Sequence, residues 1–271
     1  MKLILSEEQQ FLKDTAKSFA RDKTPTTHFR KLRDDENTKC WDDSIWQEMV
    51  QLGWSGILVP EEFGGSDFGI AGISVIMQEL GKTLTPSPIL ATSVLGVSTI
   101  NLLGSQEQKE KYLPKIVSGD VTTALAIDEG NHHSPLDVEA TAILKGDKWS
   151  LNGQKVFIID GASADYILIV ARTSGKKGES NGLSVFVSEK NSEGLEISKI
   201  STADCRNYSN LKMNNLVLEG NALLGEVDTA GEIIEKVLDL GRIAMASEML
   251  GNTEEAFEIT VNYLKERKQF G

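Results

Sequence analysis

Residues 149–159 read WSLNGQKVFII, from Trp149 to Ile159, and this stretch decides the fold. Aromatic and β-branched residues are concentrated in it, as is typical of a β-strand. Six similar short runs surround it with no helical pattern between them: Ala124 to Ile127, Ala140 to Leu144, Tyr166 to Ala171, Leu183 to Val187, Leu195 to Ile200 and Leu211 to Leu218. Turn residues separate the runs, and the polar segment Thr173 to Asn181 is expected to be a flexible hairpin tip. Seven short strands without intervening helices predict an antiparallel sandwich or barrel.

The residues before this region read as helices separated by loops. Ser6 with Gln9, and Ser105 with Gln108, have the spacing of a capping box at a helix N-terminus. Apolar residues recur three and four apart within 11–20, 45–50 and 73–80, which predicts helices there. The segment from Gly56 to Gly65 is expected to be a turn-rich loop because breakers close it.

After Gly225 the helical pattern returns and continues to the end of the chain. Apolar residues from Ile233 to Leu264 recur at mixed spacings of three and four, which predicts a helix of roughly 35 to 40 residues. Ile234, Leu238 and Met249 widen the apolar stripe beyond one face. Such a helix requires several helical partners, so we expect that the sequence is truncated and that the chain associates when expressed alone.

Composition excludes several classes of function. A formal net charge of −12 argues against a general binder of nucleic acid, whose affinity depends on clustered Lys and Arg. No uncharged run approaches the roughly 18 residues that a membrane helix requires, and no secretion signal is recognisable. Cys40 and Cys205 stand far apart, which favours a reducing cytoplasm. His132 and His133 lack a third ligand at a typical spacing, so no metal site is predicted.

Four motifs in order resemble the acyl-CoA dehydrogenase family, and the resemblance spans almost the whole chain. They are Leu52-Gly53-Trp54 leading to Pro60-Glu61-Glu62-Phe63-Gly64-Gly65, Gly104 to Pro114, Trp149 to Ile158, and Glu266-Arg267-Lys268-Gln269-Phe270-Gly271. The resemblance implies an α+β fold in three parts. Residues 1–120 would form an N-terminal helical domain and residues 121–224 a central antiparallel β-barrel or sandwich. Residues 225–271 would be the first long helix of an incomplete C-terminal helical bundle.

The resemblance also implies a function, the flavin-dependent α,β-dehydrogenation of an acyl-CoA thioester. The cofactor would be FAD, the electrons would pass to an electron-transferring flavoprotein, and the protein would be a homo- or hetero-oligomer. In such enzymes a glutamate removes the α-proton while hydride passes to the flavin. The residues expected at the cofactor are Leu125, Ile127, Asp128, Phe157, Ile159, Arg267, Gln269 and Phe270. Those expected at the substrate are Ser134, Asp239 and Arg242.

Several of these residues have a purely structural alternative. Phe157 would equally suit a β-domain core, and Ser134 a turn before Pro135. Arg242 would equally form an ion pair with Asp239 or Glu235. An arginine at the position of Arg267 is favoured in any case by the helix dipole.

The sequence departs from the family pattern at the positions that carry the chemistry. The usual catalytic base would lie beyond Gly271, and the alternative position on the long helix is Gly241, so no base is identified. Asp128 and Ile159 stand where the family places threonine hydroxyls beside the flavin. We therefore expect the 271 residues alone to be inactive. The alternative function is a non-catalytic structural subunit of a heteromeric acyl-CoA dehydrogenase, with weak or no FAD binding of its own.

Overall fold

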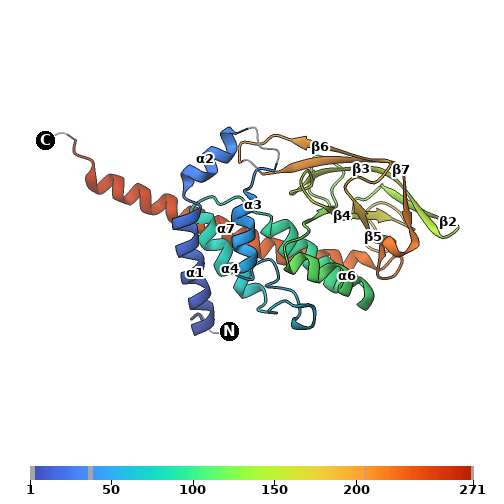
Figure 1. Cartoon of the computed structure of the whole chain (residues 1–271). Helices are drawn as coiled ribbons and strands as arrows, with labels where there is room; N and C mark the ends of the chain where they lie inside the picture. Colours follow the sequence, from blue (N-terminus) through green and yellow to red (C-terminus); the bar gives the residue numbers. More distant parts are fainter. Residues whose placement is uncertain (1–3, 36–38, 205, 270–271) are drawn as a thin grey trace.

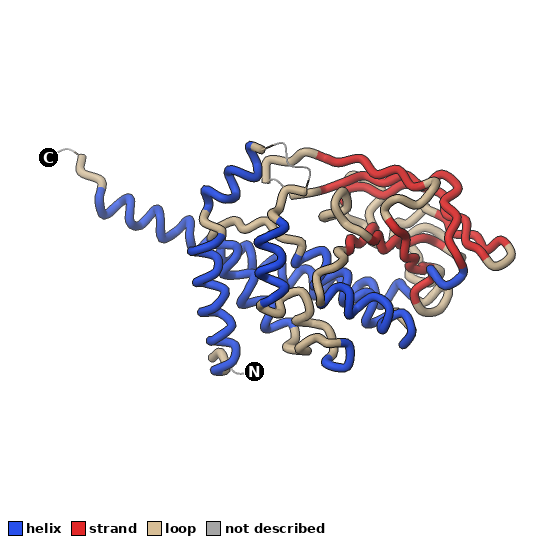
Figure 2. Tube along the Cα trace, viewed as in Figure 1, coloured by secondary structure: helices blue, strands red, loops and turns tan. Residues whose placement is uncertain are grey.

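The computed structural model describes residues 4–35, 39–204 and 206–269. Helices occupy one side of the molecule and a sheet the other, and one long helix runs beneath both and projects from the helical side (Figures 1 and 2). The buried side chains form two clusters, one within the helices and one between the sheet and the helices that face it. The mixed α+β architecture predicted from the sequence is confirmed.

The helical part contains α1 (Glu7–Lys23), α2 (Thr26–Asp34), α3 (Asp43–Gln51), the short η1 (Glu61–Phe63), α4 (Ile70–Lys82), the π-helical η2 (Ile89–Gly96), α5 (Val97–Leu103) and α6 (Gln106–Val117). Both capping boxes are present, at Ser6 and at Ser105. Helices α2, η2 and α5 were not predicted from the sequence. Every residue of η2 is buried, so the segment has no alternation of polar and apolar residues by which a helix is recognised.

The strands are β1 (Thr123–Ala126), β2 (Thr141–Lys145), β3 (Lys148–Ile158), β4 (Tyr166–Arg172), β5 (Leu183–Glu189), β6 (Leu195–Ile200), β7 (Tyr208–Glu219) and β8 (Leu223–Leu224). They form one sheet in the order β6-β7-β3-β2-β4-β5-β8, with β1 on β4. All seven predicted strands are present. Most strand pairs are antiparallel, as expected. Two pairings are parallel: β1 with β4, where Thr123 lies opposite Tyr166, and Thr141 of β2 with Arg172 of β4.

The segment between β4 and β5 is the hairpin connection that the sequence predicted. The guanidinium of Arg172 donates hydrogen bonds to the carbonyl oxygens of Ser174, Glu179 and Asn181 at 3.0–3.3 Å. It also reaches the carbonyls of Leu136 and Val138 in the loop after β1. One buried side chain therefore holds two loops together.

The long helix α7 (Ala230–Glu266) has 37 residues, within the predicted length. Its middle packs on α4 at very short range. A Cβ built on Gly81 would lie 2.2 Å from the carbonyl oxygen of Glu248, and one built on Gly251 would lie 1.8 Å from that of Gln78. Its second half leaves the body, and Phe257, Ile259 and Leu264 are exposed there. No helix in the described ranges is long and apolar enough to cross a membrane.

Candidate functional site

The ends of β1 and β3 meet at one corner of the sheet, where the sequence placed the flavin. The backbone N–H of Val156 donates to the carbonyl oxygen of Asp128 at 2.8 Å, so the two strand ends lie side by side. Leu125 and Ile127 are buried beneath this corner. The corner therefore brings together five of the predicted cofactor residues: Leu125, Ile127, Asp128, Phe157 and Ile159.

Phe157 is the exposed aromatic of this corner. It lies near the end of β3 and its side chain is 57% exposed. Its φ of 51° lies in the left-handed region, which is uncommon for an aromatic residue. Its ring meets that of Tyr208 edge to face, with centroids 6.2 Å apart. The neighbouring Ile159 is half-buried and packs against the helical cluster. Phe157 is thus presented at the surface and is not a core residue.

Asp128 holds the loop that follows β1. One carboxylate oxygen lies 2.8 Å from Nδ1 of His133, and the other accepts a hydrogen bond from the backbone N–H of Ser134 at 3.0 Å. The carbonyl of Ser134 accepts from the N–H of Asp137 at 2.9 Å, which is the hydrogen bond of a turn. The structural reading of Ser134, a turn residue before Pro135, accounts for its position. Both oxygens of Asp128 are engaged within the chain.

Lys155 and Glu129 form a buried ion pair beneath the corner that the sequence analysis missed. Nζ of Lys155 is completely buried, 2.7 Å from Oε1 of Glu129 and 2.8 Å from the carbonyl oxygen of Ile127. Burial lowers the pKa of Lys155 to about 8, although Glu129 opposes the shift. Glu129 also accepts from the backbone N–H groups of Glu139 and Ala140. A charged residue inside an apolar strand run was the signal available in the sequence.

The expected substrate residues on α7 lie on its exposed surface. Nη1 of Arg242 is 2.6 Å from Oδ1 of Asp239 and 3.4 Å from Oε2 of Glu235, so the ion pair weighed as the structural alternative is present. Gly241 is buried, and a Cβ placed on it would lie 2.7 Å from Cδ2 of Leu95 on η2. The alternative base position therefore faces a leucine side chain, which would have to move to admit a longer side chain.

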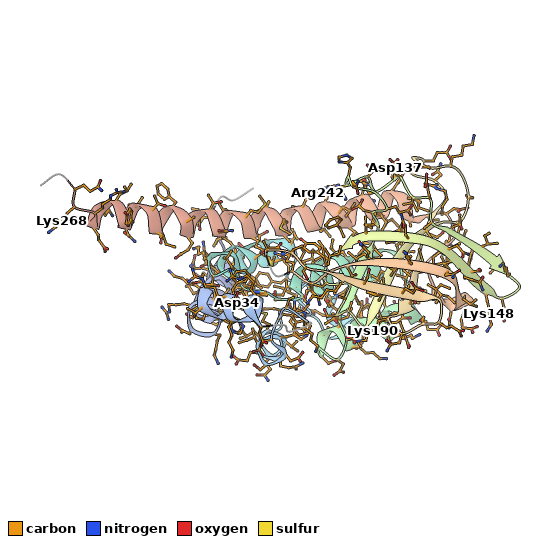
Figure 3. All side chains as sticks on the ribbon, turned by 90° about the horizontal axis from the view of Figure 1, so that it is seen from above. Asp34, Asp137, Lys148, Lys190, Arg242 and Lys268 are labelled. Carbon is orange, nitrogen blue, oxygen red and sulfur yellow. The ribbon has the colours of Figure 1, made fainter. Side chains whose placement is uncertain are left out.

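Arg267 and Gln269 lie far from the sheet corner. Both are exposed at the projecting end of α7, and Figure 3 shows Lys268 at that end, well separated from Arg242 farther back along the helix. The guanidinium of Arg267 lies over the ring of Tyr263, 5.5 Å from its centroid. Phe270 lies outside the described residues. Within one chain, the structure does not bring Arg267 and Gln269 to β1 and β3.

A second feature, which the sequence analysis missed entirely, is a cavity of about 330 Å³ on the other side of Tyr208. It lies between α2, the turn at residues 81–87, α7 and the residues Asp204 and Arg206 to Tyr208. Asp160, the residue after Ile159, also lines it. Arg206 forms an ion pair with Glu248 of α7 inside it. Burial raises the pKa of Asp160 to about 7, while Arg206 opposes the shift.

No group of three or more His, Cys, Asp or Glu side chains within the described ranges is placed to hold a metal ion.

The candidate site has two adjoining parts. One is an apolar corner with an exposed aromatic ring, and the other is a cavity with charged groups at its end.

Comparison with known proteins identifies the family. Three family models match the chain, the N-terminal, middle and C-terminal domains of acyl-CoA dehydrogenase, at residues 6–120, 124–219 and 231–271. A short-chain-specific acyl-CoA dehydrogenase from Clostridium acetobutylicum is 30% identical over 98% of this chain and 71% of its own length. A subunit of a caffeyl-CoA reductase–Etf complex from Acetobacterium woodii is also 30% identical, over 99% of this chain and 72% of its own.

A solved structure agrees with these matches. Butyryl-CoA dehydrogenase from Megasphaera elsdenii superposes with a TM-score of 0.89 at 27% identity, covering 100% of this chain and 72% of that one. Three consecutive domain models, relatives of nearly one-third identity and the shared fold lead to one conclusion. The chain belongs to the acyl-CoA dehydrogenase family.

Proposed function

We propose that this chain is a subunit of a flavin-dependent oxidoreductase that acts on the α and β carbons of an acyl-CoA thioester, with FAD against the corner formed by β1 and β3. The observation that carries the proposal is Phe157, an aromatic ring exposed beside buried apolar residues on a left-handed backbone. A non-glycine residue held in that conformation is often found at a functional site. An aromatic face beside apolar side chains suits a planar ring such as a flavin.

The residues of the corner fit a flavin by apolar contact and poorly by polar contact. Phe157, Ile127 and Ile159 offer hydrocarbon surface. The carboxylate of Asp128 has only acceptor oxygens, which already accept from Ser134 and pair with His133, so it offers no donor to a flavin edge. FAD, when bound, supplies the acceptor for the hydride from the β-carbon. This chain's own contribution would be to form a wall, to exclude water and to leave the polar edge of the ring to backbone groups.

The base for the α-proton is not expected at the alternative position on α7. Gly241 has no side chain, and Leu95 occupies the space in front of it. We propose that the base is supplied by another segment or another subunit. Electrons would leave through an electron-transferring flavoprotein, a partner suggested by the relative that belongs to an Etf complex. The exposed apolar half of α7 favours assembly into a homo- or hetero-oligomer, and a reducing cytoplasm remains the proposed compartment.

A second candidate function is a structural subunit that completes a partner's site and holds little flavin itself. This alternative is favoured by the contacts that Asp128 makes with its own loop. They leave a carboxylate, which only accepts hydrogen bonds, where a donor to the flavin edge would be expected.

The test is the flavin-to-protein absorbance ratio after gel filtration with added FAD, followed by titration of FAD into the chain. Ile159→Thr restores a hydroxyl without disturbing the loop, and the matched control is Ile143→Thr, an exposed isoleucine on β2. One added hydrogen bond of about 0.5–1.5 kcal/mol would tighten FAD binding about two- to tenfold. The double variant Ile159→Thr with Asp128→Thr is expected to raise FAD occupancy further. Asp128→Asn removes the charge but keeps an oxygen that can accept from Ser134, so it separates the effect of the charge from that of the loop contact.

Near-stoichiometric flavin in the unmodified chain would contradict weak polar binding at this corner. If Ile159→Thr binds FAD no better than the Ile143→Thr control does, the side chain of residue 159 does not face the ring, and the placement of the flavin is wrong.

A further inference from the structure

The cavity beside Tyr208 contains polar groups that its protein surroundings leave unsatisfied. Oδ2 of Asp160, Oε2 of Glu248 and both polar atoms of the Asn207 amide are buried, and none has a hydrogen-bond partner in the described part of the chain. The side chains of Asp160 and Asn207 are 6% and 1% exposed. Buried polar atoms in folded proteins are nearly always paired, so unpaired ones around a cavity indicate that something else occupies it.

The walls of the cavity are largely apolar. Phe29 of α2, Trp41, Leu84 and Met245 and Met249 of α7 line it, and its volume of about 330 Å³ is at the lower end of the range for small-molecule sites. The polar atoms gather where Arg206 and Glu248 meet Asp160. This is the arrangement of a pocket that takes a hydrocarbon body and recognises one polar group on it.

The unpaired atoms determine which polar group fits. Three are acceptors, on Asp160, Glu248 and the oxygen of Asn207, while the nitrogen of Asn207 and Nε1 of Trp41 are donors. Above the pKa of about 7 that burial gives Asp160, this residue is a carboxylate, and a ligand must then donate to it and also accept from an N–H. A hydroxyl does both, a ketone only accepts, and an ammonium only donates.

We infer that this cavity binds a small aliphatic or alicyclic molecule that carries a hydroxyl group. The cavity adjoins the proposed flavin wall, because Asp160 directly follows Ile159 and Tyr208 contacts both Phe157 and the cavity. Resting on the proposed function, the inference is that the hydroxyl belongs to the acyl part of the substrate. Binding of a hydroxylated molecule by the cavity does not itself depend on flavin or coenzyme A.

The test uses the 271-residue chain and three ring compounds of similar size: cyclohexanol, cyclohexanone and cyclohexylamine. Their affinities would be compared by saturation-transfer NMR and calorimetry at about pH 9, where Asp160 is a carboxylate. A hydrogen bond donated to a carboxylate predicts that cyclohexanol binds at least about tenfold tighter than cyclohexanone. FAD and acyl-CoA are left out, so a negative result here is distinct from a failure of flavin binding.

Two variants connect binding to the cavity. Asp160→Asn keeps the shape and suits the φ of 56° at this position, since Asn tolerates the left-handed region, and it removes the charged acceptor. It is expected to weaken cyclohexanol several-fold and cyclohexanone little. Met245→Trp is expected to fill the cavity and to abolish binding of both compounds. Glu258→Gln, an exposed carboxylate farther along α7, is the matched control and is expected to leave both affinities unchanged.

Three results would overturn the inference. Equal affinity for alcohol and ketone would mean that the polar groups recognise nothing. Tightest binding of the amine would identify a cation site. Absence of binding by all three compounds would mean that water alone satisfies the buried groups.

Discussion

Asp160→Asn should stabilise the protein, and the gain should grow with pH. The carboxyl group of Asp160 is buried, and burial raises its pKa from 3.8 to about 7. A group whose folded-state pKa is raised favours folding when it is protonated. Its contribution is therefore complete below the unfolded pKa near 3.8, declines as the pH rises, and is lost once the pH passes about 7. An asparagine carries no charge, so the variant does not lose this contribution.

The size of the effect follows from the two pKa values. Each unit of difference corresponds to about 1.4 kcal/mol, so the full range amounts to about 4 kcal/mol. Within the window from pH 5 to pH 8, the wild type loses stability between pH 5 and the folded-state pKa of about 7, a span of about two pH units. Across this window the stability of the variant relative to the wild type should therefore rise by about 3 kcal/mol. Relaxation of the cavity and entry of water would reduce this figure, which is an upper limit.

The assay is urea unfolding of wild type and variant at pH 5, 6, 7 and 8. Glu258→Gln serves as the control, and it should show the same pH dependence as the wild type because its carboxylate is exposed. A stability difference between Asp160→Asn and wild type that stays constant from pH 5 to pH 8 would refute the reasoning. It would mean that Asp160 titrates as an ordinary hydrated carboxyl group.

Two further predictions concern packing and loop order. Arg172→Lys keeps the charge and loses the planar guanidinium that donates to five carbonyl oxygens. Limited proteolysis should then cut within residues 173–181 much faster than in the wild type or in a Lys176→Arg control. Equal rates would show that this guanidinium does not order the loop. Gly251→Ala places a Cβ against the backbone of α4 and should lower the free energy of unfolding by about 1–3 kcal/mol or more. Thr253→Ala, on an exposed position two residues away, should have a small effect, and a similar loss in both variants would mean that α4 and α7 are not in close backbone contact at Gly251.

The sequence alone determined the local elements. Seven strands, both capping boxes and the long helix were predicted because each depends on residues near one another in the chain, through periodicity, turn residues and caps. It also pointed to the corner where β1 and β3 end. Segments without local contrast were missed, such as the uniformly buried η2 and the two-residue β8.

Only the tertiary structure decided what meets in space. The parallel pairing of β1 with β4 depends on the path of the chain through the β2–β3 hairpin, which periodicity does not record. Asp160, Arg206 and Glu248 come from the end of β3, the segment before β7 and the middle of α7, and each alone reads as an ordinary charged residue. Their burial around one cavity exists because α7 crosses α4 at its glycines and brings Glu248 to the end of the sheet. Local sequence patterns carry no information about contacts between residues so distant in the chain, so this site became visible only in the folded molecule.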